Sequence, residues 1–202
     1  MKKIFFPAIY AVCISPALAT NVQPYIGLNV GASYIDWNND LQDMTDELNV
    51  DLAEANINVG AEAGIRFATT NVWNGAVVVS YDYLFDSEAD NDNIYINEIT
   101  SGFSALSIGM DNYIRLGHAK KRNDLILGVG IAQITERFKF DSDYFYDKGS
   151  DSGGAAMLKI GFNRQFTENT DWYVATKFFV PFNNESDTDV IITFAGGFKF
   201  HF

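Results

Sequence analysis

The feature that most constrains this chain is its last thirteen residues, in which apolar side chains alternate with small or polar ones. One side of an extended strand would carry Ile192, Phe194, Phe198, Phe200 and Phe202, and the other would carry Thr193, Ala195, Lys199 and His201. Successive side chains of a strand point to opposite faces, so this segment needs an apolar environment on one face only. Any half-buried strand shows such a pattern, and its meaning depends on whether the rest of the chain repeats it.

Seven further segments repeat the alternation. Together with the last one they predict eight strands: Tyr25–Tyr34, Ile57–Phe67, Val72–Leu84, Phe103–Leu116, Leu125–Ile134, Ala155–Asn163, Trp172–Phe182 and Val190–Phe202. The second segment is the clearest, since apolar residues alternate with polar residues and glycines over eleven positions. The fourth is the least regular, because Asn112 shares its apolar face, and a bulge would realign it.

The other end of the chain predicts a secretory signal peptide at residues 1–19. Met1-Lys2-Lys3 is basic, Ile4–Pro16 is apolar, and Ala17-Leu18-Ala19 has the small-x-small pattern of a cleavage site. Residues 20–202 are then predicted as a single mature domain. The only cysteine, Cys13, lies in the signal, so disulfides, cysteine metal sites and thiol catalysis are excluded together.

The charge of the chain narrows its partners. The formal net charge is −12, and loss of Lys2 and Lys3 with the signal makes it −14, which argues against a nucleic-acid partner. No apolar run after Ala19 approaches the roughly 18 residues that a membrane helix requires. A membrane location would therefore have to come from strands.

The connections between the predicted strands alternate in length. Short turns are expected at Ala68–Asn71, Gly117–Asp124 and Arg164–Asp171. Long polar stretches are expected at Asp36–Asn56, Phe85–Gly102 and Thr135–Gly154, with a shorter one at Asn183–Asp189. Short turns on one side and longer loops on the other are typical of outer-membrane barrels, and this order places both termini in the periplasm. The predicted fold class is therefore all-β, an eight-stranded antiparallel up-and-down transmembrane β-barrel in the cell outer membrane.

Aromatic residues gather at both ends of the predicted strands. Trp73 and Trp172 start strands at the periplasmic boundary, whereas Tyr34, Trp37, Tyr81 and Tyr83 lie at the opposite boundary. Amphipathic rings favour membrane–water interfaces, so the sequence predicts two aromatic girdles.

Two segments carry a family resemblance. Tyr25-Ile-Gly27-Leu-Asn29-Val-Gly31-Ala-Ser-Tyr34 resembles the opening strand of the small OmpA-like outer-membrane β-barrels of Gram-negative bacteria, and Gly196-Gly197-Phe198-Lys-Phe200-His-Phe202 resembles their closing strand. The resemblance implies that Phe198, Phe200 and Phe202 form a C-terminal signal for the barrel-assembly machinery. It also implies outer-membrane lipids and lipopolysaccharide as surroundings, and it says little about function.

The polar faces of the predicted strands define a lumen network. Its expected members are Glu62, Arg66, Asp82, Asp111, Arg115, Lys159, Lys177 and Lys199. In so narrow a barrel these ions are expected to pair with one another as a polar plug. A gated ion path through the same residues is the functional alternative, and it makes a narrow porin-like channel the second candidate function.

Most acidic residues fall in the long connections. Asp36–Glu54 holds seven acids and no base, and Phe85–Glu98 holds five acids and no base. Weak, screened binding of divalent cations is the expectation there. Asp86-x-Glu88-x-Asp90-x-Asp92 spaces carboxylates like a calcium loop but has Asn91 where an EF-hand requires glycine, so no specific metal site is predicted.

No cofactor or catalytic residue is expected. A lipid hydrolase would need a Ser–His pair near the outer leaflet, yet His118 falls in a predicted periplasmic turn and His201 at the periplasmic end. The sequence thus favours a non-enzymatic outer-membrane barrel that displays acidic loops, with a surface, adhesion or envelope-integrity role. A lipid-modifying enzyme is the weakest alternative.

Overall fold

The computed structural model describes residues 22–37, 50–52, 54–68, 72–91, 96–117, 121–142, 145–182 and 188–202. The expected signal peptide, His118 and most of Asn183–Asp189 lie outside these residues. Within the described ranges, no helix has the length and apolar character needed to cross a membrane.

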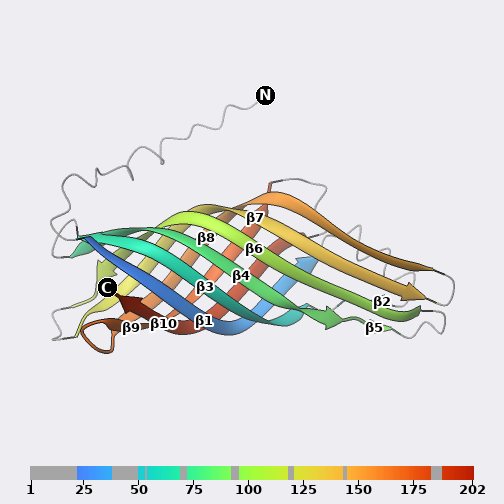
Figure 1. Ribbon diagram of the computed structural model, residues 1–202, viewed down its shortest axis with the longest axis horizontal. Helices are drawn as coiled ribbons and strands as arrows, with labels where there is room; N and C mark the ends of the chain where they lie inside the picture. The colour runs from blue at the N-terminus through green and yellow to red at the C-terminus, as the bar shows by residue number, and fades with distance from the viewer. Residues whose placement is uncertain are drawn as a thin grey trace, which may run out of the picture.

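Eight long strands close into an antiparallel barrel (Figure 1). They are β1 (Val22–Trp37), β3 (Ala55–Ala68), β4 (Trp73–Glu88), β6 (Ile96–Arg115), β7 (Asn123–Ser142), β8 (Tyr146–Gln165), β9 (Thr170–Pro181) and β10 (Thr188–His201). Each strand pairs with its neighbour in the chain, and β1 closes the barrel against β10 in the register Leu28↔Phe198. Two short strands, β2 (Val50–Asp51) and β5 (Asp90–Asn91), pair with each other outside the barrel. This closed barrel confirms the predicted fold class.

The outer wall of the barrel is apolar. Side chains such as Leu28, Val79, Leu106, Ile131 and Phe194 point outward and are 45–60% exposed, which a water-soluble protein would not tolerate over a whole sheet surface. The irregular fourth strand contains no bulge between Phe103 and Ile114, and the outward Asn112 donates from Nδ2 to the carbonyl of Leu127 at 3.3 Å.

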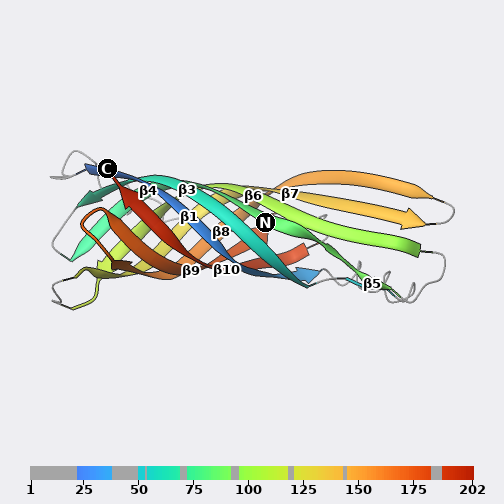
Figure 2. The ribbon, with the colours of Figure 1, turned by 60° about the horizontal axis from the view of Figure 1, so that its bottom comes forward.

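The barrel has two different ends. Its turn end carries short connections such as residues 166–169 between β8 and β9, together with the start of β1 and the end of β10. At the other end, β6, β7 and β8 continue beyond the barrel as a three-stranded extension (Figure 2). We call this extension, Ile96–Gly102, Thr135–Ser142 and Tyr146–Gly154, the tongue.

The tongue corrects the prediction that Thr135–Gly154 and Phe85–Gly102 are long loops. Residues 135–141 of β7 pair continuously with residues 146–152 of β8, and β6 already begins at Ile96. Polar contacts hold this region. Lys139 Nζ of β7 lies 2.5 Å from Glu98 Oε2 of the neighbouring β6, and Arg137 Nη2 of β7 reaches across β6 to within 2.9 Å of Asp86 Oδ1 of β4. A strand outside lipid needs no apolar face, so its sequence loses the alternation by which strands were recognised.

Inside the barrel at the tongue end, inward apolar side chains form a closed core. Its members are Ile35, Trp37, Leu84, Phe103, Ala105, Ala132, Ile134, Ala155, Met157, Phe179 and Ile191, and we call it the apolar plug. All are at most 7% exposed. The plug separates the tongue from the polar lumen below it.

Candidate functional site

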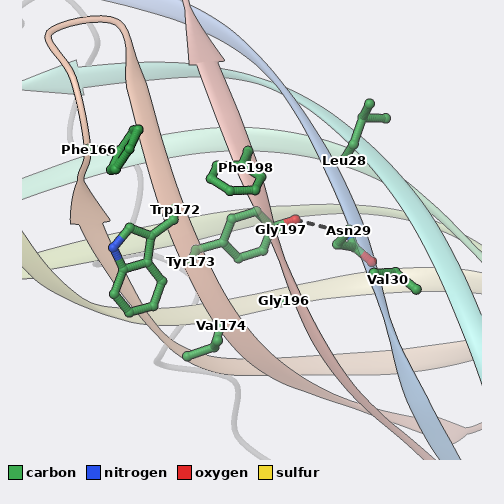
Figure 3. A pocket seen from close by; sticks show the side chains of 10 residues that line it. All are labelled: Leu28, Asn29, Val30, Phe166, Trp172, Tyr173, Val174, Gly196, Gly197 and Phe198. Atoms are coloured by element: carbon green, nitrogen blue, oxygen red, sulfur yellow. Dashed lines mark hydrogen bonds between the residues drawn. The ribbon is translucent and has the colours of Figure 1, made fainter.

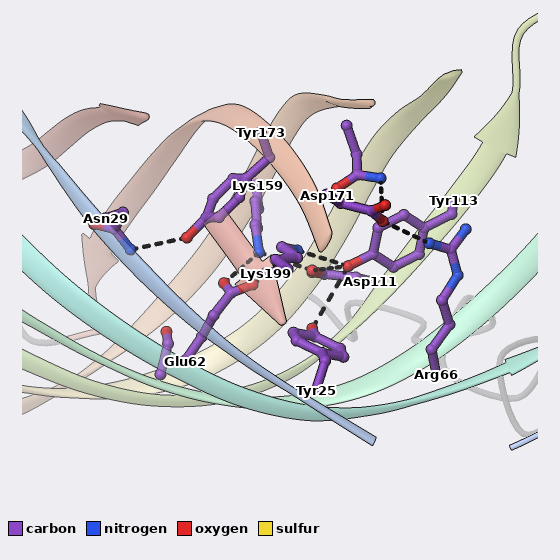
Figure 4. A network of polar contacts seen from close by, with 12 residues as sticks. Tyr25, Asn29, Glu62, Arg66, Asp111, Tyr113, Lys159, Asp171, Tyr173 and Lys199 are labelled. Atoms are coloured by element: carbon purple, nitrogen blue, oxygen red, sulfur yellow. Dashed lines mark hydrogen bonds and ion pairs between the residues drawn. The ribbon is translucent and has the colours of Figure 1, made fainter. Parts of the chain in front are cut away.

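The centre of the lumen holds four buried ions on four strands (Figure 4). Lys159 Nζ on β8 lies 2.7 Å from Asp111 Oδ2 on β6 and 3.1 Å from Glu62 Oε2 on β3. Lys199 Nζ on β10 lies 2.7 Å from Glu62 Oε1. Two lysines thus face two carboxylates, so the cluster is neutral, as burial of charges requires.

Each of the two shortest pairs spans a strand that contributes a glycine. Gly27 of β1 is the register partner of both Lys199 and Glu62, and Gly128 of β7 is the register partner of both Asp111 and Lys159. A Cβ on Gly27 would stand 2.8 Å from Glu62 Cγ, and one on Gly128 would stand 2.5 Å from Asp111 Oδ1. Because Gly27 and Gly128 have no side chain, the ionic groups on the two flanking strands have space to contact each other.

Three tyrosines surround the Lys199 ammonium. Its Nζ lies 4.5 Å from the ring centroid of Tyr173, 5.0 Å from that of Tyr25 and 5.1 Å from that of Tyr113. It also donates to Tyr113 Oη at 2.8 Å. Cation–π attraction of this kind adds to the ion pair with Glu62 and fixes the side chain in the middle of the lumen.

A second charge pair lies nearer the tongue end. Lys177 Nζ donates to Asp82 Oδ2 at 2.7 Å and to Ser80 Oγ at 3.1 Å, and Ser80 contacts Ser107 Oγ at 2.7 Å. These side chains lie next to the apolar plug, on the side away from the tongue, and they link β9 to β4 and β6 through the lumen.

A third cluster fills the turn end, and Arg66 is its one member in the predicted lumen network. Arg66 Nη2 lies 2.8 Å from Asp124 Oδ2, Arg122 pairs with both Asp124 and Asp171, and His201 Nε2 lies 3.0 Å from Asp171 Oδ2. Arg122, Asp124 and Asp171 fall in the predicted turns, although the position of Asp171, two residues before the inward Tyr173, is a usable signal in the sequence.

The structure brings seven of the eight expected lumen residues into these three clusters: Glu62, Arg66, Asp82, Asp111, Lys159, Lys177 and Lys199. The prediction that Arg115 belongs to the lumen network is wrong, because this residue is exposed. It is the last residue of β6, where the wall ends and the lumen opens, so an inward position no longer implies burial.

The outward aromatic residues also require one correction. Tyr34 and Tyr81 are exposed on the outer wall, Tyr83 lies under the Arg137 guanidinium at 4.5 Å, and Trp73 and Trp172 are half-buried at the turn end. Trp37 is instead buried in the apolar plug, 5.5 Å from the Phe103 ring, because it shares the inward face of β1 with Ile35. Phe198, Phe200 and Phe202 all point outward, at 50%, 44% and 75% exposure.

The described lumen contains both charged and apolar side chains. Its cations and carboxylates are matched in three clusters, and the apolar plug covers them at the tongue end. Among the described residues, no group of three or more His, Cys, Asp or Glu side chains is arranged to hold a metal ion. His201, whose ring nitrogen contacts Asp171, lies at the turn end, away from the tongue.

Comparisons with known proteins agree with this architecture. No protein-family model and no curated protein sequence matches the chain. Solved structures do match: the attachment invasion locus protein Ail of Yersinia pestis has a TM-score of 0.52 at 12% identity, with 91% of this chain and 100% of that one covered. Neisserial surface protein A has a TM-score of 0.51 at 10% identity, with 90% and 99% covered.

A third match extends the set. The N-terminal barrel domain of Pseudomonas aeruginosa OprF has a TM-score of 0.50 at 12% identity, with 90% of this chain and 100% of that one covered. Identities this low establish the fold and leave the function open. Together with the closed barrel of eight strands, the matches confirm that the chain has the fold of the small OmpA-like outer-membrane barrels.

Proposed function

We propose that the protein is a non-enzymatic integral protein of the outer membrane, whose closed barrel holds the tongue outside the cell for contact with external surfaces. The observation that carries the proposal is the contrast between a filled lumen and three strands that extend far beyond the lipid-facing wall. Both termini, at the turn end, then lie in the periplasm. Lipopolysaccharide surrounds the wall, and the outward Phe198, Phe200 and Phe202 serve the assembly machinery.

The filled lumen argues against the channel alternative. An ion crossing the barrel would have to break buried pairs such as Lys177–Asp82 and then pass the apolar plug, where Trp37 and Phe103 are 6% and 2% exposed. An apolar constriction disfavours water as well as ions. The lumen is therefore better suited to hold the wall rigid than to conduct.

The length of the tongue argues for a role outside the membrane. β6, β7 and β8 each have 20 residues, whereas a tilted membrane strand needs about 9–11. About half of each strand therefore extends beyond the hydrocarbon layer. Within the described chain, β9 pairs with β8 only from Ala155 onward, so the backbone of Tyr146–Gly153 offers an open edge for a partner strand. Ail, one of the similar folds, is named for attachment and invasion.

Orientation is tested by labelling single cysteines on whole cells. Ser150→Cys places a thiol on the exposed tongue, and Thr167→Cys places one in the exposed turn between β8 and β9. A membrane-impermeant maleimide should label Ser150→Cys in intact cells, and Thr167→Cys only after the outer membrane is opened. The reverse result would invert the topology.

Two further measurements test the role itself. In planar bilayers the refolded protein should show no steady discrete openings, and regular openings would favour the channel. Replacement of residues 140–147 by a two-residue turn removes the tip of the tongue. Under the proposal, cells with this variant should adhere less than wild-type cells, because the tip of the tongue and the first two residues of the open edge are lost. Adherence equal to that of wild-type cells would move the function to the barrel wall and an envelope-integrity role.

A further inference from the structure

The outer wall has a groove near the turn end, with a volume of about 670 Å³ (Figure 3). Outward side chains from three places line it: Leu28 and Val30 of β1, Trp172 and Val174 of β9 with Phe166 of the adjoining turn, and Phe198 of β10. This lining is almost entirely apolar. The volume falls in the range of small-ligand sites, although the groove is open along one side.

The groove exists because one outward position lacks a side chain. Gly196 points away from the lumen and is the register partner of Val30 on one side and Val174 on the other. A Cβ there would meet Val174 Cγ1 at 3.6 Å, an ordinary contact, whereas a Cβ on the inward Gly197 would collide with the carbonyl of Leu28. Strand packing therefore demands glycine at 197 but not at 196, and the space at Gly196 is free for an occupant.

Two cations flank the turn end of the groove. Arg164 of β8 is exposed and is the register partner of the groove residue Trp172. Lys121 is exposed, donates from Nζ to the carbonyl of Phe166 at 3.1 Å, and lies 5.8 Å from the centre of its ring. Glu168 is the single carboxylate of the turn 166–169, so the charge beside the groove is positive in a strongly acidic protein.

We propose that this groove binds one acyl chain of an anionic glycerophospholipid, whose phosphate pairs with Lys121 and Arg164. The apolar lining faces the part of the bilayer where acyl chains lie, and Trp172 stands at the interface that indole rings favour. The cations then lie at headgroup level, where each basic side chain attracts an anionic lipid. The inference rests on the proposed membrane orientation for its assignment to the periplasmic leaflet, but the groove and its charges do not depend on that orientation.

The test uses the fluorescence of Trp172. The full mature protein with Trp37→Phe and Trp73→Phe keeps only this indole, and the matched protein with Trp37→Phe and Trp172→Phe keeps only Trp73, which lies outside the groove. Both are refolded into vesicles that contain a small fraction of phosphatidylglycerol or phosphatidylethanolamine with brominated chains. Bromine quenches an indole that it touches. Heat-dependent gel mobility verifies that every variant is folded.

If the groove binds an anionic lipid, half-maximal quenching of Trp172 should need less brominated phosphatidylglycerol than brominated phosphatidylethanolamine. The mole fraction needed should be at least fivefold lower for phosphatidylglycerol. Trp73 should show no such preference. Lys121→Ala and Arg164→Ala should each weaken the preference about fivefold, while Lys148→Ala on the tongue should leave it unchanged. Gly196→Leu should abolish it by filling the groove, whereas Ala61→Leu, outward on β3, should not.

Equal quenching by the two lipids would overturn the proposal and identify ordinary contact with the bilayer. Retention of the preference in Gly196→Leu, or in the Lys121→Ala, Arg164→Ala double variant, would overturn it too. Brominated lipid occupies both leaflets of the vesicles, so an inverted topology would not alter these results. The cysteine labelling in cells reports orientation separately, and the two failures can be told apart.

Discussion

Replacement of Glu62 by glutamine should be among the most damaging single changes in the barrel. Glu62 is 2% exposed and faces both Lys199, at 2.7 Å, and Lys159, at 3.1 Å. Glutamine keeps the size of the side chain and removes its charge. The two lysines would then share Asp111 as the remaining carboxylate of the central cluster, and the lumen would hold one uncompensated positive charge.

The cost follows from what remains after the substitution. At an effective dielectric constant near 20, each Glu62–lysine pair contributes about 5–6 kcal/mol of attraction, most of which offsets desolvation of the ions. Removal of one partner of a buried pair leaves the desolvation in place, and the observed loss is then about 3–5 kcal/mol in the free energy of unfolding. The loss should appear as a lower denaturant midpoint with little change in slope.

The assay is reversible urea unfolding in lipid vesicles, followed by tryptophan fluorescence and by gel mobility of unheated samples. Addition of Lys199→Met to Glu62→Gln leaves Lys159 and Asp111 as a one-to-one pair, so the double variant should recover about 1–3 kcal/mol. Ser33→Ala is the matched control. Its hydroxyl is buried in the same lumen without a hydrogen-bond partner in the described structure, and its loss should cost about 1 kcal/mol or less. If Glu62→Gln cost no more than Ser33→Ala, or if the double variant were less stable than the single one, the charge-balance reasoning would be refuted.

Three further predictions follow from the same structure. Val79 faces lipid at 45% exposure, so Val79→Arg should lower the free energy of unfolding by about 2–4 kcal/mol. Ser150→Arg on the tongue should change it by about 0.5 kcal/mol or less. Similar values for the two variants in the same urea assay would contradict the assignment of the lipid face. After replacement of residues 140–147 by a tight turn, the unheated barrel should still migrate faster on a gel than the boiled protein, because the Lys139↔Lys148 register brings the cut ends together. Loss of this heat-dependent shift in gel mobility would mean that the tongue is needed for folding. The hydrogen bond to Glu98 raises the pKa of Lys139, so the stabilising contact is fully present below the ordinary lysine pKa and is lost as pH rises through the raised value. NMR titration should give a lower pKa for Lys139 in Glu98→Gln than in the wild type. An unchanged pKa would exclude the contact in solution.

The alternation of the sequence was sufficient to predict the barrel and the face of most residues. It identified the outward Ile108 and Val129 as readily as the inward Glu62 and Lys159, because lipid and a polar lumen impose opposite demands on alternate positions. The alternation did not identify strands beyond the bilayer, where no face of a strand has to contact lipid. The tongue has no face that must meet lipid, and only single apolar residues such as Ile99 and Phe140 pack in a small cluster with Val50 and Ala89. The sequence of Thr135–Gly154 therefore lacks a regular alternation and resembles a loop, although its backbone continues the ladder of β7 and β8.

The errors within the barrel have a different cause. The level of Trp37 along the strand predicts a place in a girdle, yet its side chain lies on the same face as Ser33 and Ile35 and points into the plug. Arg115 has the inward parity of Asp111 but lies beyond the end of the covered lumen. Face and level must both be known to place a residue, and level depends on register with neighbouring strands, which a single sequence does not contain.

Register also explains how a barrel of this width accommodates so many long inward side chains. Tyr25 lies opposite Gly64, whose added Cβ would stand 2.6 Å from the tyrosine ring, and Glu62 and Lys199 meet over Gly27. Asp111 and Lys159 meet over Gly128 in the same way. Large inward residues are thus set beside inward glycines on the next strand, so ions two strands apart come within 2.7 Å. A one-residue slip would turn these glycines outward and leave the charges facing lipid, and the network therefore fixes the register of the barrel as well as filling it.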